Sequence, residues 1–418
     1  MSARLTAVQA RTNGRLAILL LMGAAMSCDL SVNCRNLAAA FRAVNWHASP
    51  VELGILAASG PAVYTVGCLT LGHLSDRLGR RNSALMGLGL AALCAAGHYW
   101  SAEVWQLVVW SSIYGLAMSL FWPTTSAWFS ELASLSPGAL NRALGNFNVA
   151  WSSGMVLGAV IGGVLWRAIG PLTFLALVAL LVTVGVALFW VPQRRPVESV
   201  SEEISPEAAT PEPTVDPAVT SRFLVSARLV SFLSWFMTGV LLTILPKLAS
   251  LLGMPENQTG LSIAAYYFAI VLLLWAGRTS SRWQYRLWPL ILPAPLAVVG
   301  MGAVASARSL PMFLGACLIA GVCTALSVST SLYYALHGRE SGRAASTALH
   351  EAVVGLGGVT GGLVSGVLAE SMIARLGLEN ALRGSLLLVA ALAVVMGLAQ
   401  LVVWPLMRRA AERRAEAS

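Results

Sequence analysis

A short charged loop, Gly72-His73-Leu74-Ser75-Asp76-Arg77-Leu78-Gly79-Arg80-Arg81, lies between two long apolar segments of the chain. It holds three arginines and one aspartate, although only 11% of the 418 residues are charged. Two apolar helices that are joined by so short a loop are expected to cross a bilayer as antiparallel neighbours. Because cytoplasmic loops of membrane proteins are enriched in arginine, we expect this loop on the cytoplasmic side.

The composition of the whole chain agrees with a membrane protein. Hydrophobic residues make up 57% of the sequence and the mean hydropathy is +0.73, whereas a soluble domain carries about 25% charged residues. The net charge of +9 could indicate a nucleic-acid partner. The arginines gather in the expected loops and tail instead, so we interpret the excess as topological and expect the lipid bilayer, and no nucleic acid, as the partner.

Apolar runs that are long enough to span a bilayer contain about 20 residues each. The sequence predicts an all-α membrane protein with twelve such helices. They are expected at residues 15–40, 51–72, 82–100, 104–133, 141–168, 171–191, 223–251, 257–278, 286–306, 309–336, 342–375 and 381–407.

A proline-rich, acidic segment at 192–221 divides these helices into two groups of six. A segment of this composition cannot bury a core, so a disordered cytoplasmic linker is expected. The resulting domains are an N-terminal bundle at 1–191, a C-terminal bundle at 222–407 and a basic cytoplasmic tail at 408–418. With both termini inside the cell, most arginines fall on the cytoplasmic side, as the positive-inside rule requires.

The charged loop also matches a known signature. Its pattern G-x-x-x-D-R-x-G-R-R resembles the loop between the second and third helices of the major facilitator superfamily. The resemblance implies a secondary transporter with two pseudo-symmetric six-helix bundles that rock about a central site, usually as a monomer. The matching positions are Gly72, Asp76, Arg77, Gly79, Arg80 and Arg81.

A weak internal repeat supports two related halves. The segment Gly277–Arg286 keeps the first glycine and two arginines of the loop but lacks its aspartate. The glycines of segment 141–168 and those of segment 342–375 also recur at helical spacing. They are Gly154, Gly158 and Gly162 in the first half and Gly358, Gly362 and Gly366 in the second.

The first helix carries an ionisable group deep in the expected membrane span. Asp29, Asn33 and Asn36 share one stripe, and Asp29 lies roughly 20 Å along the helix. A carboxyl group at that depth is a candidate functional site, and the stretch around it is similar to the first-helix acid motif of proton-driven drug exporters. Two interpretations stay open: Asp29 exchanges a proton, or it pairs with Arg35 or another helix for structural reasons.

Two further motifs resemble those of exporters, each with one departure. The ladder Gly154-x-x-x-Gly158-x-x-x-Gly162-Gly163 resembles the antiporter signature, but Ala159 occupies the position of its proline. Exporters of this kind also have an arginine four residues before the glycine that matches Gly115, where this chain has Ser111. These departures weaken the assignment to exporters and leave the superfamily untouched.

His350 and Glu351 form a second polar pair in the helix expected at 342–375. Neighbours in sequence do not share a helix face, so one is expected to face the cavity and the other a partner helix. A proton relay and a gating contact are both open. Glu131 and Arg142, at the inner ends of their helices, are expected to act as a gate or latch.

The walls of a central site are expected to be aromatic and hydroxyl-rich. Such a pocket suits a neutral or cationic amphipathic molecule, although serine, threonine and tryptophan also serve helix packing and membrane interfaces. The candidate substrate residues are Trp122, Asn146, Asn148, Trp235, Tyr333 and Tyr334, with Asn33 and Arg35 of the first helix.

The sequence favours a transporter over an enzyme. It contains no nucleophile–base pair, phosphate loop or metal-binding cluster, and neither a metal nor a cofactor is expected. Our first hypothesis is proton-coupled export of a small amphipathic molecule; the second is uptake of a polar solute such as a sugar, organic acid or nucleoside by symport or uniport. A receptor without transport activity is a third. Because Lys247 is the single lysine, the chain fits a GC-rich bacterial genome, and hence a bacterial inner membrane.

The loop signature yields a first prediction. In the superfamily its aspartate faces the N-terminus of the helix expected at 342–375, here next to Arg343, and a carboxylate is favourable at a positive helix end by about 0.3–1 kcal/mol. We expect Asp76→Asn to express and fold normally but to transport more slowly, because the latch between the halves is weakened. Transport assays at matched expression test this. If Asp76 and its arginines only anchor the loop to the membrane, turnover stays normal.

Overall fold

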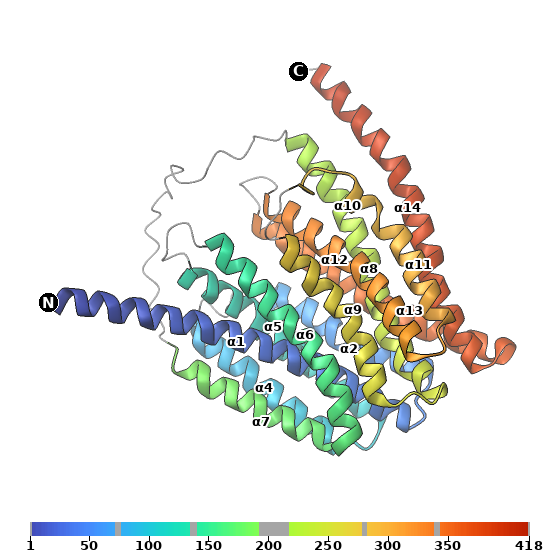
Figure 1. Cartoon of the computed structure of the whole chain (residues 1–418), viewed down its shortest axis with the longest axis horizontal. Helices are drawn as coiled ribbons and strands as arrows, with labels where there is room; N and C mark the ends of the chain where they lie inside the picture. Colours follow the sequence, from blue (N-terminus) through green and yellow to red (C-terminus); the bar gives the residue numbers. More distant parts are fainter. Residues whose placement is uncertain are drawn as a thin grey trace.

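The computed structural model describes residues 2–71, 77–133, 140–191, 217–277, 282–337 and 343–416. Every regular element in these ranges is an α-helix, and the helices form two groups that follow one another along the chain (Figure 1). The first group contains α1 (Ser2–Asn45), α2 (Pro50–Leu71), α4 (Arg80–Trp100), α5 (Val104–Ala133), α6 (Leu140–Ile169) and α7 (Leu172–Phe189).

The second group begins inside the segment that was expected to be a linker, because α8 already starts at Pro217. Residues 192–216 of that segment lie outside the described ranges. The helices of this group are α8 (Pro217–Leu251), α9 (Glu256–Gly277), α10 (Trp288–Ile291), α11 (Pro293–Ser306), α12 (Leu310–His337), α13 (Arg343–Leu376) and α14 (Leu378–Glu416).

The predicted spans agree with these helices, with one exception. The ninth span, expected as a single helix at 286–306, is divided into α10 and α11 at Leu292. Proline has no N–H to donate and clashes with the preceding turn, and Pro293 lies in the first turn of α11, where a missing N–H leaves no helical hydrogen bond unmade. If α10 and α11 are counted as one broken span, the described ranges contain the twelve expected helices.

Eleven described helical stretches are long and apolar enough to cross a membrane. Helix α4 is not among them, although it was predicted as the third span. Its sequence starts with Arg80, Arg81 and Asn82 and includes His98 near its end, which lowers its hydropathy. This helix is nevertheless packed between α5 and α7 within the first group.

Successive helices run in opposite directions, so the bundle has two ends. The termini end carries the last residues of α2, α5, α7, α9 and α12, together with the starts of α1 and α8. The opposite end carries the turns at 46–49, 101–103, 170–171, 252–255, 307–309 and 377.

In the described part of the chain, the buried apolar cluster that joins the two groups lies toward the opposite end. One cluster belongs to the first group alone and includes Leu21, Phe121 and Leu188, which lie toward the termini end. A larger cluster unites both groups, and its members from the first group, such as Phe41 and Leu53, lie toward the opposite end. In this conformation the two halves therefore share a core at one end and have separate cores at the other.

Glycines let the helices of the two halves touch backbone to backbone. A Cβ added at Gly54 of α2 would lie 2.6 Å from the carbonyl oxygen of Gly362 in α13. A Cβ added at Gly260 of α9 would lie 2.5 Å from the carbonyl oxygen of Ala159 in α6. The same α6 ladder also contacts α1, since a Cβ added at Gly158 would lie 2.5 Å from the carbonyl oxygen of Leu30; small residues at this spacing allow helices to approach closely.

We expect Gly54→Ala to destabilise the protein, because an added methyl group would overlap the α13 backbone; overpacking of this kind costs about 1–3 kcal/mol. Gly302→Ala in α11 is the matched control, since a Cβ there meets no atom within 4 Å and alanine favours a helix by about 1 kcal/mol over glycine. Melting temperatures of the purified proteins in one detergent measure both. Equal melting temperatures for the two variants would show that the α2–α13 contact is looser than described.

Candidate functional site

Asp29 lies where α1 packs against the glycine ladder of α6. A Cβ added at Gly154 would lie 3.0 Å from Asp29 Cβ, and one added at Gly158 would lie 3.0 Å from Asn33 Cβ. Asn33 Nδ2 donates to the backbone carbonyl of Asp29 at 2.9 Å, which fixes the amide along the helix. The expected stripe of Asp29 and Asn33 is thus placed on the seam between α1 and α6, within the apolar stretch Leu16–Asn45.

The second half repeats this seam with different side chains. A Cβ added at Gly357 of α13 would lie 3.0 Å from Trp235 Cβ of α8. Gly361, one turn further, contacts the backbone of Phe236. Trp235 therefore occupies in the second half the place that Asp29 occupies in the first, and its indole Nε1 is buried without a hydrogen-bond partner among the described residues.

A tyrosine interacts electrostatically with acidic residues of both halves. The Tyr64 hydroxyl of α2 is within electrostatic range of both Glu351 and Asp29, and it forms a hydrogen bond with the Cys68 thiol. Tyr267 of α9 is also within electrostatic range of Asp29. The sequence had singled out the two acidic residues separately, and the fold brings both within electrostatic range of one tyrosine.

His350 points away from this group. It is buried, and its Nδ1 lies 2.7 Å from Ser331 Oγ of α12, so it contacts a partner helix while the neighbouring Glu351 faces the centre. Arg228 of α8 is close enough to His350 for their charges to interact. The structure thus separates the two members of the His–Glu pair, as expected for adjacent residues of a helix.

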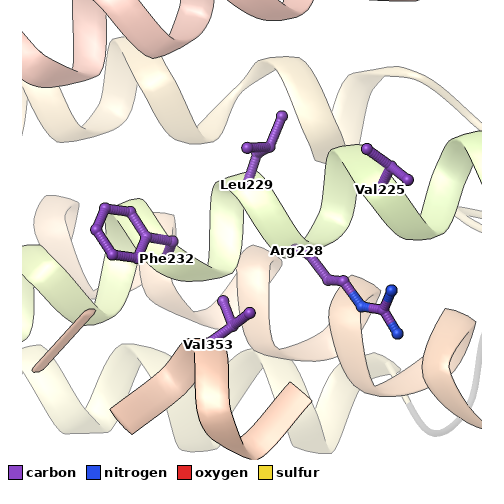
Figure 2. A pocket seen from close by; sticks show the side chains of 5 residues that line it. All are labelled: Val225, Arg228, Leu229, Phe232 and Val353. Carbon is purple, nitrogen blue, oxygen red and sulfur yellow. The ribbon is translucent and has the colours of Figure 1, made fainter. Parts of the chain in front are cut away.

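Arg228 borders an apolar crevice of about 280 Å³ between α8 and α13. Figure 2 shows the guanidinium extending from α8 past the α13 ribbon, while Val353 rises from α13. The other lining residues are Val225, Leu229 and Phe232, all on α8. Arg228 lies near the start of the membrane-span candidate Arg222–Leu251.

Arg35 is not paired with Asp29. The Arg35 residue is 4% exposed, and its guanidinium points into the first half, where Nη1 donates to Ser111 Oγ of α5 at 2.8 Å. The same nitrogen lies 3.4 Å from Nε2 of His98 in α4, and the guanidinium carbon lies 4.2 Å from the ring centre of Tyr114. The structural alternative for Asp29, an ion pair with Arg35, therefore does not occur in this conformation.

The remaining expected substrate residues are dispersed. Asn148 accepts a hydrogen bond from Trp151 Nε1 at 3.0 Å, and Trp122 packs edge-on against Phe121; both side chains are half-buried, as is Asn146. Tyr333 and Tyr334 belong to an aromatic cluster with Phe223, Trp283 and Tyr285 near the termini end. The two tyrosines therefore pack beneath the turn that precedes α10 rather than beside Asp29.

The loop signature is described only from Arg77 onward. Arg77 is exposed, and Gly79 adopts a φ of 82°, a conformation that favours glycine, directly before α4. Arg80 Nε forms an ion pair with Glu131 Oε1 of α5 at 3.0 Å, and Arg81 lies over the Phe189 ring. Gly72 and Asp76 lie outside the described residues, as do the side chains of Arg142 and Arg343.

Two polar contacts close the opposite end between the halves. Arg167 Nη1 of α6 donates to Asn257 Oδ1 of α9 at 2.8 Å. Lys247 of α8 donates through Nζ to the backbone carbonyl of Ala48 in the α1–α2 turn. Together with the glycine contacts, these bonds hold the two halves together at the end remote from the termini.

The sequence profile of the Major Facilitator Superfamily matches residues 19–346. The chain belongs to the major facilitator superfamily. It is accordingly a multi-pass membrane protein and a secondary transporter rather than an enzyme. Among the described residues, no group of three or more His, Cys, Asp or Glu side chains is placed to hold a metal ion.

Two curated relatives in the superfamily are exporters by name. The chain is 29% identical over 136 residues to an enterobactin exporter of Citrobacter koseri, a match that covers 31% of this chain and 30% of the relative. It is 30% identical over 124 residues to a tetracenomycin C resistance and export protein of Streptomyces glaucescens, covering 30% of this chain and 23% of the relative. The matched region thus spans less than a third of each relative.

Solved superfamily structures match over nearly the full length. A bacterial homologue of the human lysosomal transporter Spinster, in an inward-facing and unoccupied conformation, superposes with a TM-score of 0.75 at 14% identity, covering 95% of this chain and 97% of that one. The nucleoside transporter NupG gives a TM-score of 0.72 at 12% identity, with 93% and 99% covered. At these identities the likeness establishes the fold.

Sequence reasoning missed Tyr64, Arg228 and His98. Tyr64 was one hydroxyl in an apolar helix, and nothing in the sequence placed it within electrostatic range of acidic residues of two other helices. For Arg228 and His98 a signal was available, since each is an ionisable residue inside a long apolar segment, which is a functional candidate by default.

We expect Lys247→Met to open the halves at the opposite end more often, because the charged donor to the Ala48 carbonyl is lost. Opening can be measured with a membrane-impermeant maleimide added from that side, using Asn33→Cys in a background without the six native cysteines. The labelling rate should rise several-fold. Arg308→Met, which removes an exposed charge from the same end, serves as the control; equal labelling of both variants would contradict the assigned contact.

Proposed function

We propose that this transporter exports a small amphipathic molecule in exchange for protons, and that the carboxyl group of Asp29 carries the proton. The observation that carries the proposal is the position of Asp29: it lies on the α1–α6 seam, in an apolar stretch of α1 that is long enough to cross a membrane. An ionised carboxylate there is costly. A proton or a bound cargo offsets that cost, so the two can exchange.

The conformation supports a cycle of alternating access. The halves share a core and two polar contacts at the opposite end, whereas their cores are separate at the termini end. If both termini are cytoplasmic, this is the state in which cargo enters from the cytoplasm. Opening the opposite end would then release cargo and let Asp29 take up a proton from the other side.

Asp29, Glu351 and Tyr64 are the residues that could take part in the exchange of proton and cargo. Asp29 belongs to the first half and Glu351 to the second, and the Tyr64 hydroxyl lies within range of both charges. A cationic or polar part of a cargo placed here would be attracted by both carboxylates, while its apolar part would meet aromatic and aliphatic side chains. His350, which bonds to Ser331, would act on the helix contact rather than on cargo.

The names of the two curated relatives favour export over uptake. We infer further that the protein works as a monomer in a bacterial inner membrane, with both termini in the cytoplasm. The domains would be the bundles at 1–191 and 222–407, joined by the segment at 192–221. Uptake of a polar solute is the alternative that the sequence left open, and it would move cargo in the opposite direction. A dye-export assay distinguishes uptake from export.

The test uses bacterial cells that lack their own exporters and are loaded with ethidium or doxorubicin. Cells with the wild-type protein should lose dye faster than cells with an empty vector, and a protonophore should abolish the difference. Asp29→Asn should retain the dye at matched expression, because the amide cannot exchange a proton. Asp29→Glu, which keeps a carboxyl group, should restore part of the export.

Glu103→Gln is the matched control, because it converts an exposed carboxylate in the α4–α5 turn to an amide. It should export like the wild type. Export by Asp29→Asn at the wild-type rate, or wild-type export that persists with the protonophore, would refute the proposed coupling. If the wild type retains both dyes as the empty vector does, the uptake hypothesis is favoured.

A further inference from the structure

Arg35 is held in a closed polar site inside the first half. It comes from α1, its Nη1 donates to Ser111 Oγ of α5, and Nη2 donates to Asn36 Oδ1. The guanidinium lies over the ring of Tyr114, whose hydroxyl is 3.1 Å from Ser31 Oγ of α1. The cation is therefore anchored between α1, α4 and α5 rather than exposed to a cavity.

The ring of His98 is oriented so that it presents a hydrogen-bond acceptor, and not an N–H group, to Arg35. Its Nδ1 lies 2.7 Å from the Cys94 carbonyl oxygen, which can only accept, so this nitrogen carries the hydrogen. Its Nε2 is then the acceptor for Arg35 Nη1 or for Ser111 Oγ, which lies 3.2 Å away. The imidazole is fully buried and stacks near Phe174, so this arrangement is fixed by packing.

The charge of Arg35 is not explained by its hydrogen bonds. Its described partners are a hydroxyl, an amide oxygen, an imidazole nitrogen and an aromatic face, and no carboxylate pairs with it in the described part of the chain. Its Nε also lacks a partner there. A neutral amide side chain could serve these acceptors without the cost of a buried charge.

The resemblance to exporters predicts a buried positive charge near this site. In the exporters that this chain resembles, an arginine is expected at the position of Ser111, four residues before Gly115. In this protein the side chain at position 111 is only a hydroxyl, and it accepts the hydrogen bond from Arg35. The α2 backbone borders the same site, since a Cβ added at Gly60 would lie 3.2 Å from the Ser111 carbonyl oxygen and 4.0 Å from Arg35 Nη2.

We propose that Arg35 is a positioning residue that supplies from α1 the fixed cation that the resembled exporters carry on their fourth helix, and that transport requires this charge at the Ser111 site. The inference deepens the proposed function, on which it rests. With Asp29 ionised, its charge offsets that of Arg35 on the same helix; with Asp29 protonated, the charge of Arg35 is left without this offset. Arg35 would thereby set how the charge balance in the middle of α1 changes between the two halves of the cycle.

The test exchanges the charge between the two helices. Export of ethidium or doxorubicin by Arg35→Ser should fall by at least about tenfold, equivalent to a barrier increase of about 1.4 kcal/mol. The double variant Arg35→Ser/Ser111→Arg returns the guanidinium to the same site from α5 and should recover most of the export. A double variant with the wild-type melting temperature but the low export of Arg35→Ser would overturn the proposal.

A second pair of variants covers the case in which the double variant does not fold. Arg35→Lys keeps the charge and Arg35→Gln keeps only hydrogen-bonding capacity, so export should persist in the first and be lost in the second. Equal export by the two would overturn the proposal, as would normal export by Arg35→Ser. Asp29→Asn is assayed alongside: loss of export in that variant with normal export in Arg35→Gln leaves proton coupling standing and removes only the role of Arg35.

Discussion

The structure depends on the approach of helix backbones at glycines. Gly154 and Gly158 of α6 admit α1, while Gly163 on the next face of the same helix admits α9 of the other half. The equivalent helix α13 contacts α8 through Gly357 and α2 through Gly362. Since the glycines contribute no side chain to these contacts, α6 and α13 each lie close both to a helix of their own half and to a helix of the other half.

This arrangement explains why the ionisable residues meet where they do. Asp29 lies on a seam of α6, and Glu351 precedes the glycines of α13 by little more than one turn. Glu351 therefore belongs to a helix that borders the other half, and Asp29 packs against such a helix. The relative movement of the halves changes the surroundings of both groups together, which is the physical requirement for coupling a proton to a conformational change.

The sequence specified the fold more completely than the site. Apolar runs of membrane length and a loop with alternating glycines and arginines define spans and orientation without knowledge of packing. They could not reveal the break at Leu292, which depends on how Pro293 is accommodated, nor the neighbours of Arg35. Those neighbours come from α4 and α5, and residues so far from Arg35 in the sequence form no local pattern with it that could be recognised. The stripe of Asp29 and Asn33 was predictable because both lie on one helix.

The two halves have diverged most where they face the centre. Asp29 and Trp235 occupy equivalent seams, but one is an acid and the other an aromatic donor. The turns before α4 and α10 have diverged as well: Gly79 takes a positive φ without strain, whereas Tyr285 takes a φ of 51° and is stabilised by a backbone hydrogen bond to Tyr334 Oη at 2.9 Å. The two halves thus share the same helix contacts but present different side chains at equivalent positions.

The division of the cores has a consequence for biogenesis. The cluster around Leu21 and Phe121 contains residues of the first half alone, so it can form as soon as α7 has been synthesised. Phe41 and Leu53 belong instead to the cluster shared with the second half, and their neighbours there are made much later. A ribosome-bound first half would therefore insert with one end packed and the other end incomplete until the helices from α8 to α14 are made.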